Sequence, residues 1–410
     1  MEILSIITIL ILLSTAFSYV NERFIQLPGT IGVMAVALII SILILVAGKS
    51  NSGISVTVTT VAHSINFSKV LFDVMLGFLL FASAIHFDYK KLKALRRPIF
   101  ILSTIGVLIS AIIFGGLLYV VTGLFHIDLP AIYCFIFGAL ISPTDPIAVS
   151  SILKKSKMPA RLNIIISGES LFNDAVGLIS FVTLIGIVHQ SGARATIAGT
   201  ITLLAQDVIG GISIGLIIGY LGYRLIRSIR DFQTIILLSV STVLGISVVA
   251  NIFHASIPLA VVTAGLLIGN LSFGKDHPAN EHLNKVWQLL DEVLNTILFV
   301  MIGLQLITMS FLSNYWLIGS ISIIIILLAR MITVTLPAIF LLRKINFSNL
   351  SILTWAGLRG GISVAMALSM PDSPYRETIL SATYFIVVFS ILVQGLTLNK
   401  VVDNLTKRIS

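Results

Sequence analysis

The sequence GESLFND, residues 168–174, lies between the apolar runs RLNIII (161–166) and AVGLISFVTLIGIV (175–188). Together these residues are long enough to cross a bilayer as one helix. Residues four apart share a face of a helix, so Ser170 and Asp174 form one polar stripe, and Glu169 and Asn173 form the adjacent one. Polar and charged side chains are costly in the middle of a membrane helix. We therefore expect this segment to pair with other charges, to bind a ligand or to reach water.

The composition supports a membrane protein. Of the 410 residues, 57% are hydrophobic and only 10% are charged, whereas soluble domains carry about 25% charged residues. The first apolar run has no preceding basic residue and no small-residue cleavage site, so it is interpreted as a span and not as a signal peptide. The single Cys134 allows no internal disulfide. We expect an all-α integral membrane protein with no soluble domain.

Apolar windows predict thirteen transmembrane helices, and the basic residues predict their orientation. Most of the 26 basic residues follow odd-numbered spans, which places the N-terminus outside and the C-terminus in the cytoplasm. The net charge of +9 is thus explained by topology, and nucleic-acid binding is not expected. The predicted spans are 3–20, 30–47, 67–87, 98–124, 131–153, 163–188, 196–223, 232–251, 255–272, 286–308, 315–342, 349–370 and 377–400.

The fifth and twelfth predicted spans contain helix breakers near mid-depth. Pro143 and Pro146 interrupt GALISPTDPIAV (138–149), because proline has no backbone N–H to donate. Gly357, Gly360 and Gly361 weaken the helix in TWAGLRGGISVAM (354–366). Paired interrupted helices in two halves of a transporter are typical of an ion site. The two spans are seven apart and have opposite orientations, as an inverted repeat requires.

Five ionisable residues fall near the middle of predicted spans, and each costs about 2.5–3.5 kcal/mol at the centre of a membrane helix. They are Asp145, Glu169, Asp174, Arg330 and Arg359. Carboxylate, hydroxyl, amide and freed carbonyl oxygens suit a hard cation such as Na⁺ or Li⁺. Loss of water also disfavours a charged carboxylate. The central hypothesis is that Asp174 holds either a proton or a cation, and never both.

Five motifs occur in an order that resembles the electroneutral NhaP/NHE-like branch of the monovalent cation:proton antiporter family. They are ISPTDPIAV (141–149), GESLFNDAVGL (168–178), VLNTILFVMIGLQL (293–306), WAGLRGGISVAMAL (355–368) and VVFSILVQGLTL (387–398). The resemblance implies a homodimeric Na⁺/H⁺ antiporter in a prokaryotic cytoplasmic membrane, which is not an enzyme and needs no cofactor. Its partners would be monovalent cations, protons and membrane lipid.

The resemblance also implies that the helices form two parts with different functions. Residues 98–190 and 315–403 would form an ion-carrying core whose discontinuous fifth and twelfth spans cross each other. Residues 1–97 and 195–308 would form a dimerisation scaffold, against which the core moves like an elevator. One departure is Ala82, because relatives often carry an acid at this position of the third span.

Carried over position by position, the resemblance assigns Asp174 as the acid that binds H⁺ or Na⁺. Asp145, Ser170 and Thr144 resemble its co-ligands. Asn173 stands where electrogenic relatives have a second aspartate, which implies one-for-one, electroneutral exchange.

The remaining assignments from the resemblance are structural. Glu169 and Arg330 resemble a buried ion pair. Arg359 resembles a residue that compensates the dipoles of the broken helices, since a cation is stabilising at helix C-termini.

Several alternatives remain open. Asp145 could cap the broken helix, and Asn173 and Thr144 could simply bond freed backbone groups. A K⁺/H⁺ antiporter or K⁺ efflux system is the main alternative function, because ligand types alone do not separate Na⁺ from K⁺. An intramembrane enzyme and a passive channel are weaker alternatives. Asp207 is given no role, and the stripe Gly211, Gly215 and Gly219 is expected in helix packing or at a dimer interface.

Overall fold

The computed structural model describes residues 3–50, 67–145, 149, 158–189, 197–271, 273, 279–308, 315–341 and 347–406. All regular elements in these ranges are helical. Ten helices in the described ranges are long and apolar enough to cross a membrane. The prediction of an all-α membrane protein is therefore confirmed.

The helices are labelled α, and their π-helical stretches are labelled η. In the N-terminal half they are α1 (Ile3–Val20), η1 (Asn21–Ile25), α2 (Gly29–Ser50), α4 (Phe67–Lys69), η2 (Val70–Met75), α5 (Leu76–Ile85), α6 (Tyr89–Ala94), α7 (Arg96–Phe100), η3 (Ile101–Gly106), α8 (Val107–Leu124), α9 (Ala131–Ile141) and α11 (Ala160–His189). In the C-terminal half they are α12 (Ile197–Arg227), α13 (Phe232–Ile252), α14 (Ile257–Asn270), α15 (Ala279–Thr308), α16 (Trp316–Leu341), α17 (Phe347–Trp355), α18 (Gly361–Leu368), α19 (Arg376–Phe389), η4 (Ser390–Gly395) and α20 (Leu396–Thr406).

Three of the thirteen predicted spans coincide with shorter helices. The fifth begins as α9, which has 11 residues, and the ninth is α14, which has 14. The twelfth is divided into α17 and α18, with 9 and 8 residues. The two spans predicted to contain breaks are thus among the three that lack one long helix in the described chain.

Local sequence explains where several helices begin. Asp231 caps α13 by accepting a hydrogen bond from the Thr234 backbone N–H at 2.8 Å. Ser256 caps α14 in the same way, and Pro258 lies in its first turn. Side-chain acceptors at this position satisfy N–H groups that have no partner in the first turn, and proline is tolerated there. These caps fix the first turns of α13 and α14.

The glycine stripe of α12 packs against α14 of the same chain. A Cβ added at Gly215 would meet the backbone oxygen of Ala260, and one at Gly219 would meet the Cα of Ala264 at 2.8 Å. Small residues at this spacing let two membrane helices approach closely. Of the two roles expected for the stripe, the structure describes helix packing within the chain.

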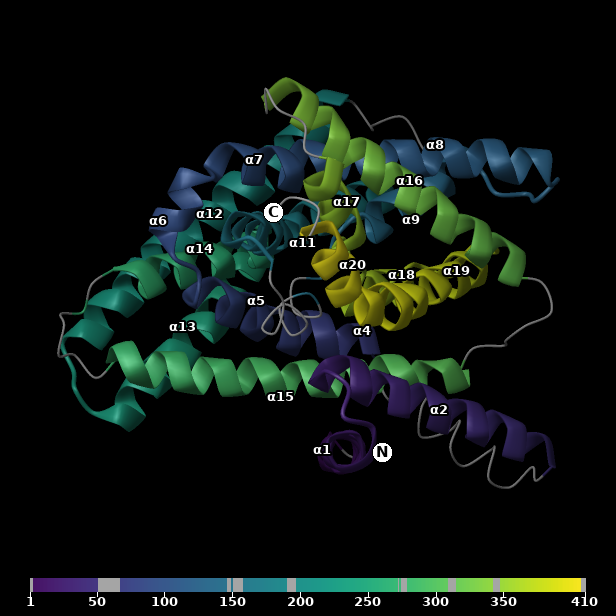
Figure 1. Cartoon of the computed structure of the whole chain (residues 1–410). Coiled ribbons are helices and arrows are strands. Elements are labelled where there is room, and N and C mark those ends of the chain that lie inside the picture. The colour runs from purple at the N-terminus through teal and green to yellow at the C-terminus, as the bar shows by residue number, and fades with distance from the viewer. Residues whose placement is uncertain are drawn as a thin grey trace.

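Helix α11 lies near the centre of the molecule and joins two hydrophobic clusters (Figure 1). One cluster includes Leu162 and Phe181 of α11 and draws on α8, α9 and α16–α20. The other includes Leu171 of α11 and draws on α5, α12, α13 and α14. Because α11 is packed on both sides, its polar stripe at 169–174 is surrounded by protein and not by lipid.

Candidate ion-binding site

Two interrupted helices meet beside α11. Helix α9 ends at Ile141, and the chain from Pro143 to Asp145 is not helical. The second interruption lies between Trp355, where α17 ends, and Gly361, where α18 begins. The backbone N–H of Asp145 donates to the carbonyl of Leu358 at 2.7 Å, which joins the two interruptions directly. Pro146 lies outside the described residues.

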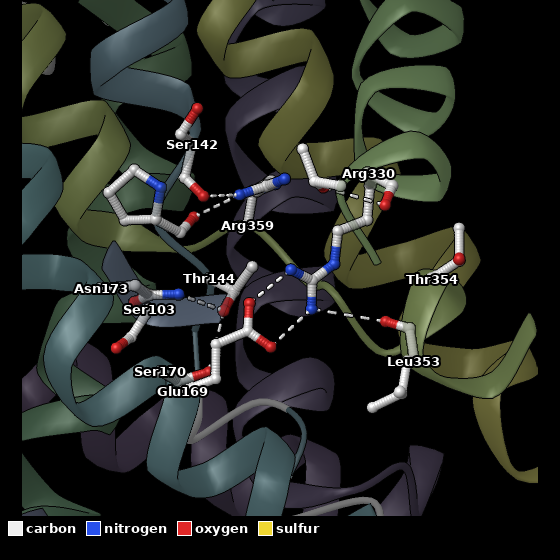
Figure 2. Close-up of polar contacts among 12 residues, drawn as sticks. Ser103, Ser142, Thr144, Glu169, Ser170, Asn173, Arg330, Leu353, Thr354 and Arg359 are labelled. Carbon is white, nitrogen blue, oxygen red and sulfur yellow. Dashed lines mark hydrogen bonds and ion pairs between the residues drawn. The ribbon is translucent and has the colours of Figure 1, made fainter. Parts of the chain in front are cut away.

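The side chain of Arg359 crosses from the second interruption to the first (Figure 2). Its Nη1 donates to the carbonyl oxygen of Ser142 and, at 2.8 Å, to that of Pro143. In a continuous helix the Ser142 carbonyl would accept from residue 146, but that residue is a proline and has no N–H. The guanidinium therefore satisfies carbonyls that the helix break leaves without their usual donor.

A short chain of polar side chains connects the first interruption to α11. Asn173 Nδ2 donates to Thr144 Oγ1 at 2.7 Å, and Thr144 Oγ1 lies 2.8 Å from Ser170 Oγ. All three residues are buried. Among the described residues, Asn173 Oδ1 has no hydrogen-bond partner. The amide oxygen thus retains its acceptor capacity within the site.

Asp174 and Asp145, which directly follow Asn173 and Thr144 in the sequence, complete this group of buried polar residues. Asp174 is 5% exposed and Asp145 is 9% exposed, whereas the neighbouring Glu169 is only 1% exposed. Within the described part of the chain, no basic side chain forms an ion pair with Asp174. A buried acid without a cationic partner is costly in its charged form unless a proton or a cation joins it.

Glu169, in contrast, is fully engaged. Arg330 of α16 donates from Nη1 to Glu169 Oε1 and from Nη2 to Glu169 Oε2, the latter at 2.9 Å (Figure 2). Arg330 Nη2 also lies 3.5 Å from the carbonyl of Leu353 in α17. This bidentate ion pair joins α11 to α16. Its acidic member, Glu169, directly precedes Ser170 of the site.

The glycines of the second interruption leave room for functional side chains. A Cβ at Gly357 would lie 2.7 Å from Arg330 Nε, and one at Gly360 would meet the carboxylate of Asp145. Gly360 has φ −128° and ψ −161°, which is extended backbone open to any residue. Gly360 is therefore needed for space and not for an unusual backbone conformation.

Sequence reasoning missed two groups that hold this region. One is the carbonyl of Leu358, which accepts the Asp145 N–H. The other is Ser390 of η4, whose Oγ accepts the N–H of Arg359 at 2.8 Å. The pattern that could have identified Ser390 is the pair of polar residues, Ser390 and Gln394, four positions apart in an otherwise apolar run.

The arrangement brings together all the proposed ligand residues: Asp145, Thr144, Ser170, Asn173 and Asp174. Their oxygens are those that hard cations prefer. Asp174 has no ion pair among the described residues, and the buried Arg330 and Arg359 donate to Glu169 and to backbone carbonyls. The site can therefore accept a small positive charge, either a proton or a metal cation.

Comparison with known proteins finds matches along nearly the whole chain. Residues 8–403 match the family described as sodium/hydrogen exchanger, transmembrane. The chain is 42% identical to the Na(+)/H(+) antiporter NhaP of Pseudomonas aeruginosa, over 97% of this chain and 96% of that protein. It is 30% identical to the Na(+)/H(+) antiporter NhaH of Halobacillus dabanensis, over 83% of this chain and 84% of that protein.

The fold is similar to the solved structure of the sodium proton antiporter MjNhaP1 from Methanocaldococcus jannaschii, with a TM-score of 0.76, 20% sequence identity and 99% of both chains covered. At this low identity the likeness shows the fold alone. The family is shown by the sequence matches, which extend over nearly the whole chain. The chain therefore belongs to the sodium/hydrogen exchanger family.

Proposed function

We propose that this multi-pass membrane protein exchanges Na⁺, and also Li⁺, for H⁺ by alternating access. The observation that carries the proposal is the contrast between two acids five residues apart on α11. Glu169 is neutralised by Arg330, whereas Asp174 has no basic partner among the described residues and retains 5% exposure. A proton or a cation would fill the same role at Asp174, and competition between them would give obligatory exchange.

The co-ligands in this proposal are Asp145, Ser170, Thr144 and Asn173. The hydrogen bonds among Thr144, Ser170 and Asn173 support it, because they join three oxygen-bearing side chains whose neighbours in the sequence include both acids. Asn173 adds no titratable group beside Asp174. We therefore propose one-for-one, electroneutral exchange. No enzymatic activity is proposed, and the names of the relatives favour Na⁺ over K⁺.

The architecture proposed for this function has thirteen spans, with the N-terminus outside and the C-terminus in the cytoplasm. Residues 98–190 and 315–403 would form the ion-carrying core, built on an inverted repeat whose broken spans cross each other. Residues 1–97 and 195–308 would form the scaffold of a homodimer, against which the core moves like an elevator. The bacterial relatives favour a location in the cell membrane.

Arg359 has a separate role in the proposal. Its guanidinium contacts two carbonyls at the end of α9, where the partial negative charge of a helix C-terminus is concentrated. A permanent cation there would stabilise the broken backbone without forming an ion pair with Asp174. Arg330 would act likewise toward Glu169, as a structural partner.

The test of the function is exchange by the purified protein in liposomes. After a pH gradient is established, Na⁺ and Li⁺ should dissipate it and K⁺ should not. The apparent KM for Na⁺ should rise as the pH falls, because protons compete for Asp174. Clamping the membrane potential at different values should leave the rate unchanged. A measured charge movement would contradict electroneutrality, and dissipation by K⁺ alone would favour the K⁺/H⁺ alternative.

Replacing Gly360 with Ala should weaken cation binding. The added Cβ would meet the Asp145 carboxylate, and overpacking of this kind costs about 1–3 kcal/mol. We expect a higher apparent KM for Na⁺ in liposomes. Gly116→Ala is the matched control, because a Cβ there meets nothing within 4 Å. Equal KM values for the two variants would show that Asp145 does not need the space beside Gly360.

A further inference from the structure

The peptide unit between Leu358 and Arg359 is hydrogen-bonded through both its C=O and its N–H group. Its carbonyl accepts the N–H of Asp145 at 2.7 Å, and its N–H donates to Ser390 Oγ at 2.8 Å. In a trans peptide the C=O and N–H point in opposite directions, and the described chain contains no cis peptide bond. One rigid plane thus connects the last membrane helix to the backbone of a proposed cation ligand.

We propose that Ser390 is a positioning residue for cation binding, acting on Asp145 through the Leu358–Arg359 peptide. The proposal rests on the proposed function, since it assumes that Asp145 is a ligand of the transported cation. Residues 356–360 are not helical, so this peptide has no helical ladder to fix its orientation. Ser390 supplies the missing constraint from η4, and its side chain is fully buried.

Further contacts from the same helix hold the start of the interruption. Gln394 Nε2 lies 3.4 Å from the carbonyl of Trp355, and Trp355 Nε1 donates to Thr397 Oγ1 at 2.9 Å. Gln394 is 3% exposed. The segment formed by η4 and α20 therefore contacts the interruption at two places, at Trp355 and at Arg359. Single π-helical turns are frequent at functional sites, and here the turn begins at Ser390.

An ordinary structural role for the hydroxyl is the alternative. Buried Ser and Thr residues in membrane helices commonly bond to a carbonyl one turn earlier in their own helix. Thr383 of α19 does so, with its Oγ1 donating to the carbonyl of Ile379 at 2.7 Å. Ser390 differs because its oxygen accepts a hydrogen bond from another segment, the one that carries Arg359. Thr383 is therefore a matched control on the same span.

The experiment compares Ser390→Ala, Ser390→Thr and Thr383→Val with the wild-type chain in liposomes. Loss of the Ser390 acceptor leaves the Arg359 N–H without its partner, so the carbonyl that holds Asp145 loses its fixed direction. We expect the apparent KM for Na⁺ and Li⁺ to rise about three- to tenfold in Ser390→Ala, the effect of roughly one hydrogen bond on a binding equilibrium. The maximal rate should stay close to that of the wild type. Ser390→Thr keeps the acceptor oxygen and should restore the wild-type KM.

Thermal unfolding separates positioning from stability. Ser390→Ala and Thr383→Val each remove one buried hydroxyl, and both should lower the Tm modestly, but only Ser390→Ala should change the KM. If Ser390→Ala does not fold, Ser390→Cys is used instead, since a thiol is a weaker acceptor of similar size and should still raise the KM. An unchanged KM in the folded Ser390 variant, or an equal change in Thr383→Val, overturns the proposal. Absence of exchange in the wild-type chain would instead refute the proposed function.

Discussion

Asp174→Asn is expected to reduce Na⁺-driven proton movement to the level of protein-free liposomes. An amide is nearly the same size as a carboxylate but can neither take up a proton nor carry a negative charge. Asp174 has no ion pair among the described residues, so the substitution leaves no cation without its partner. We therefore expect the Tm to stay the same or to rise, because a buried charge that is costly to desolvate is removed.

Asp207→Asn is the matched control for this experiment. Asp207 is also an acid within a candidate span, Ala205–Arg227, and it lies outside the proposed site. Exchange by this variant should match the wild type. Asp145→Asn should give an intermediate result, with a higher KM for Na⁺, since one acid remains. Proton movement against a Na⁺ gradient by Asp174→Asn would show that Asp174 is not the exchanging acid.

Much of the architecture could be predicted from the sequence, because membranes impose strong rules on composition. Hydropathy and the placement of charges along the chain indicated a helical membrane protein, and the structure has ten long apolar helices in its described ranges. Proline and glycine act through the local backbone. For that reason the interruptions could be placed in advance near Pro143 and near Gly357–Gly361, where α9 ends and where α17 and α18 are separated.

The contacts between segments could not be predicted in the same way. Hydropathy indicates how deep a residue lies along a span, but it does not indicate which neighbour its side chain faces. The bond from Asp145 to the Leu358 carbonyl joins residues more than 200 positions apart and involves only backbone atoms. No side-chain pattern encodes such a bond. The acceptor role of Ser390 was missed because its motif shows a polar residue but not the segment that this residue faces.

Breaking the Glu169–Arg330 pair should destabilise the protein strongly. Both side chains are buried, at 1% and 8% exposure, and removing one partner leaves an unpaired charge inside the membrane helices. Such changes typically cost about 3–5 kcal/mol. We expect Glu169→Gln and Arg330→Gln each to lower the yield of folded protein and its Tm. Exchanging the two residues, in Glu169→Arg with Arg330→Glu, should recover more folded protein than either charge reversal alone.

An exposed ion pair of the same chain is the control for this experiment. Arg376 Nη1 lies 3.0 Å from Asp372 Oδ1, but the Asp372 side chain is 99% exposed, and exposed pairs contribute little to stability. Asp372→Asn should therefore leave the Tm almost unchanged. The decisive readout is the exchange rate per folded molecule. If Glu169→Gln folds as well as the wild type but loses exchange, then the Glu169 carboxylate takes part in transport and its pairing with Arg330 is not a structural device.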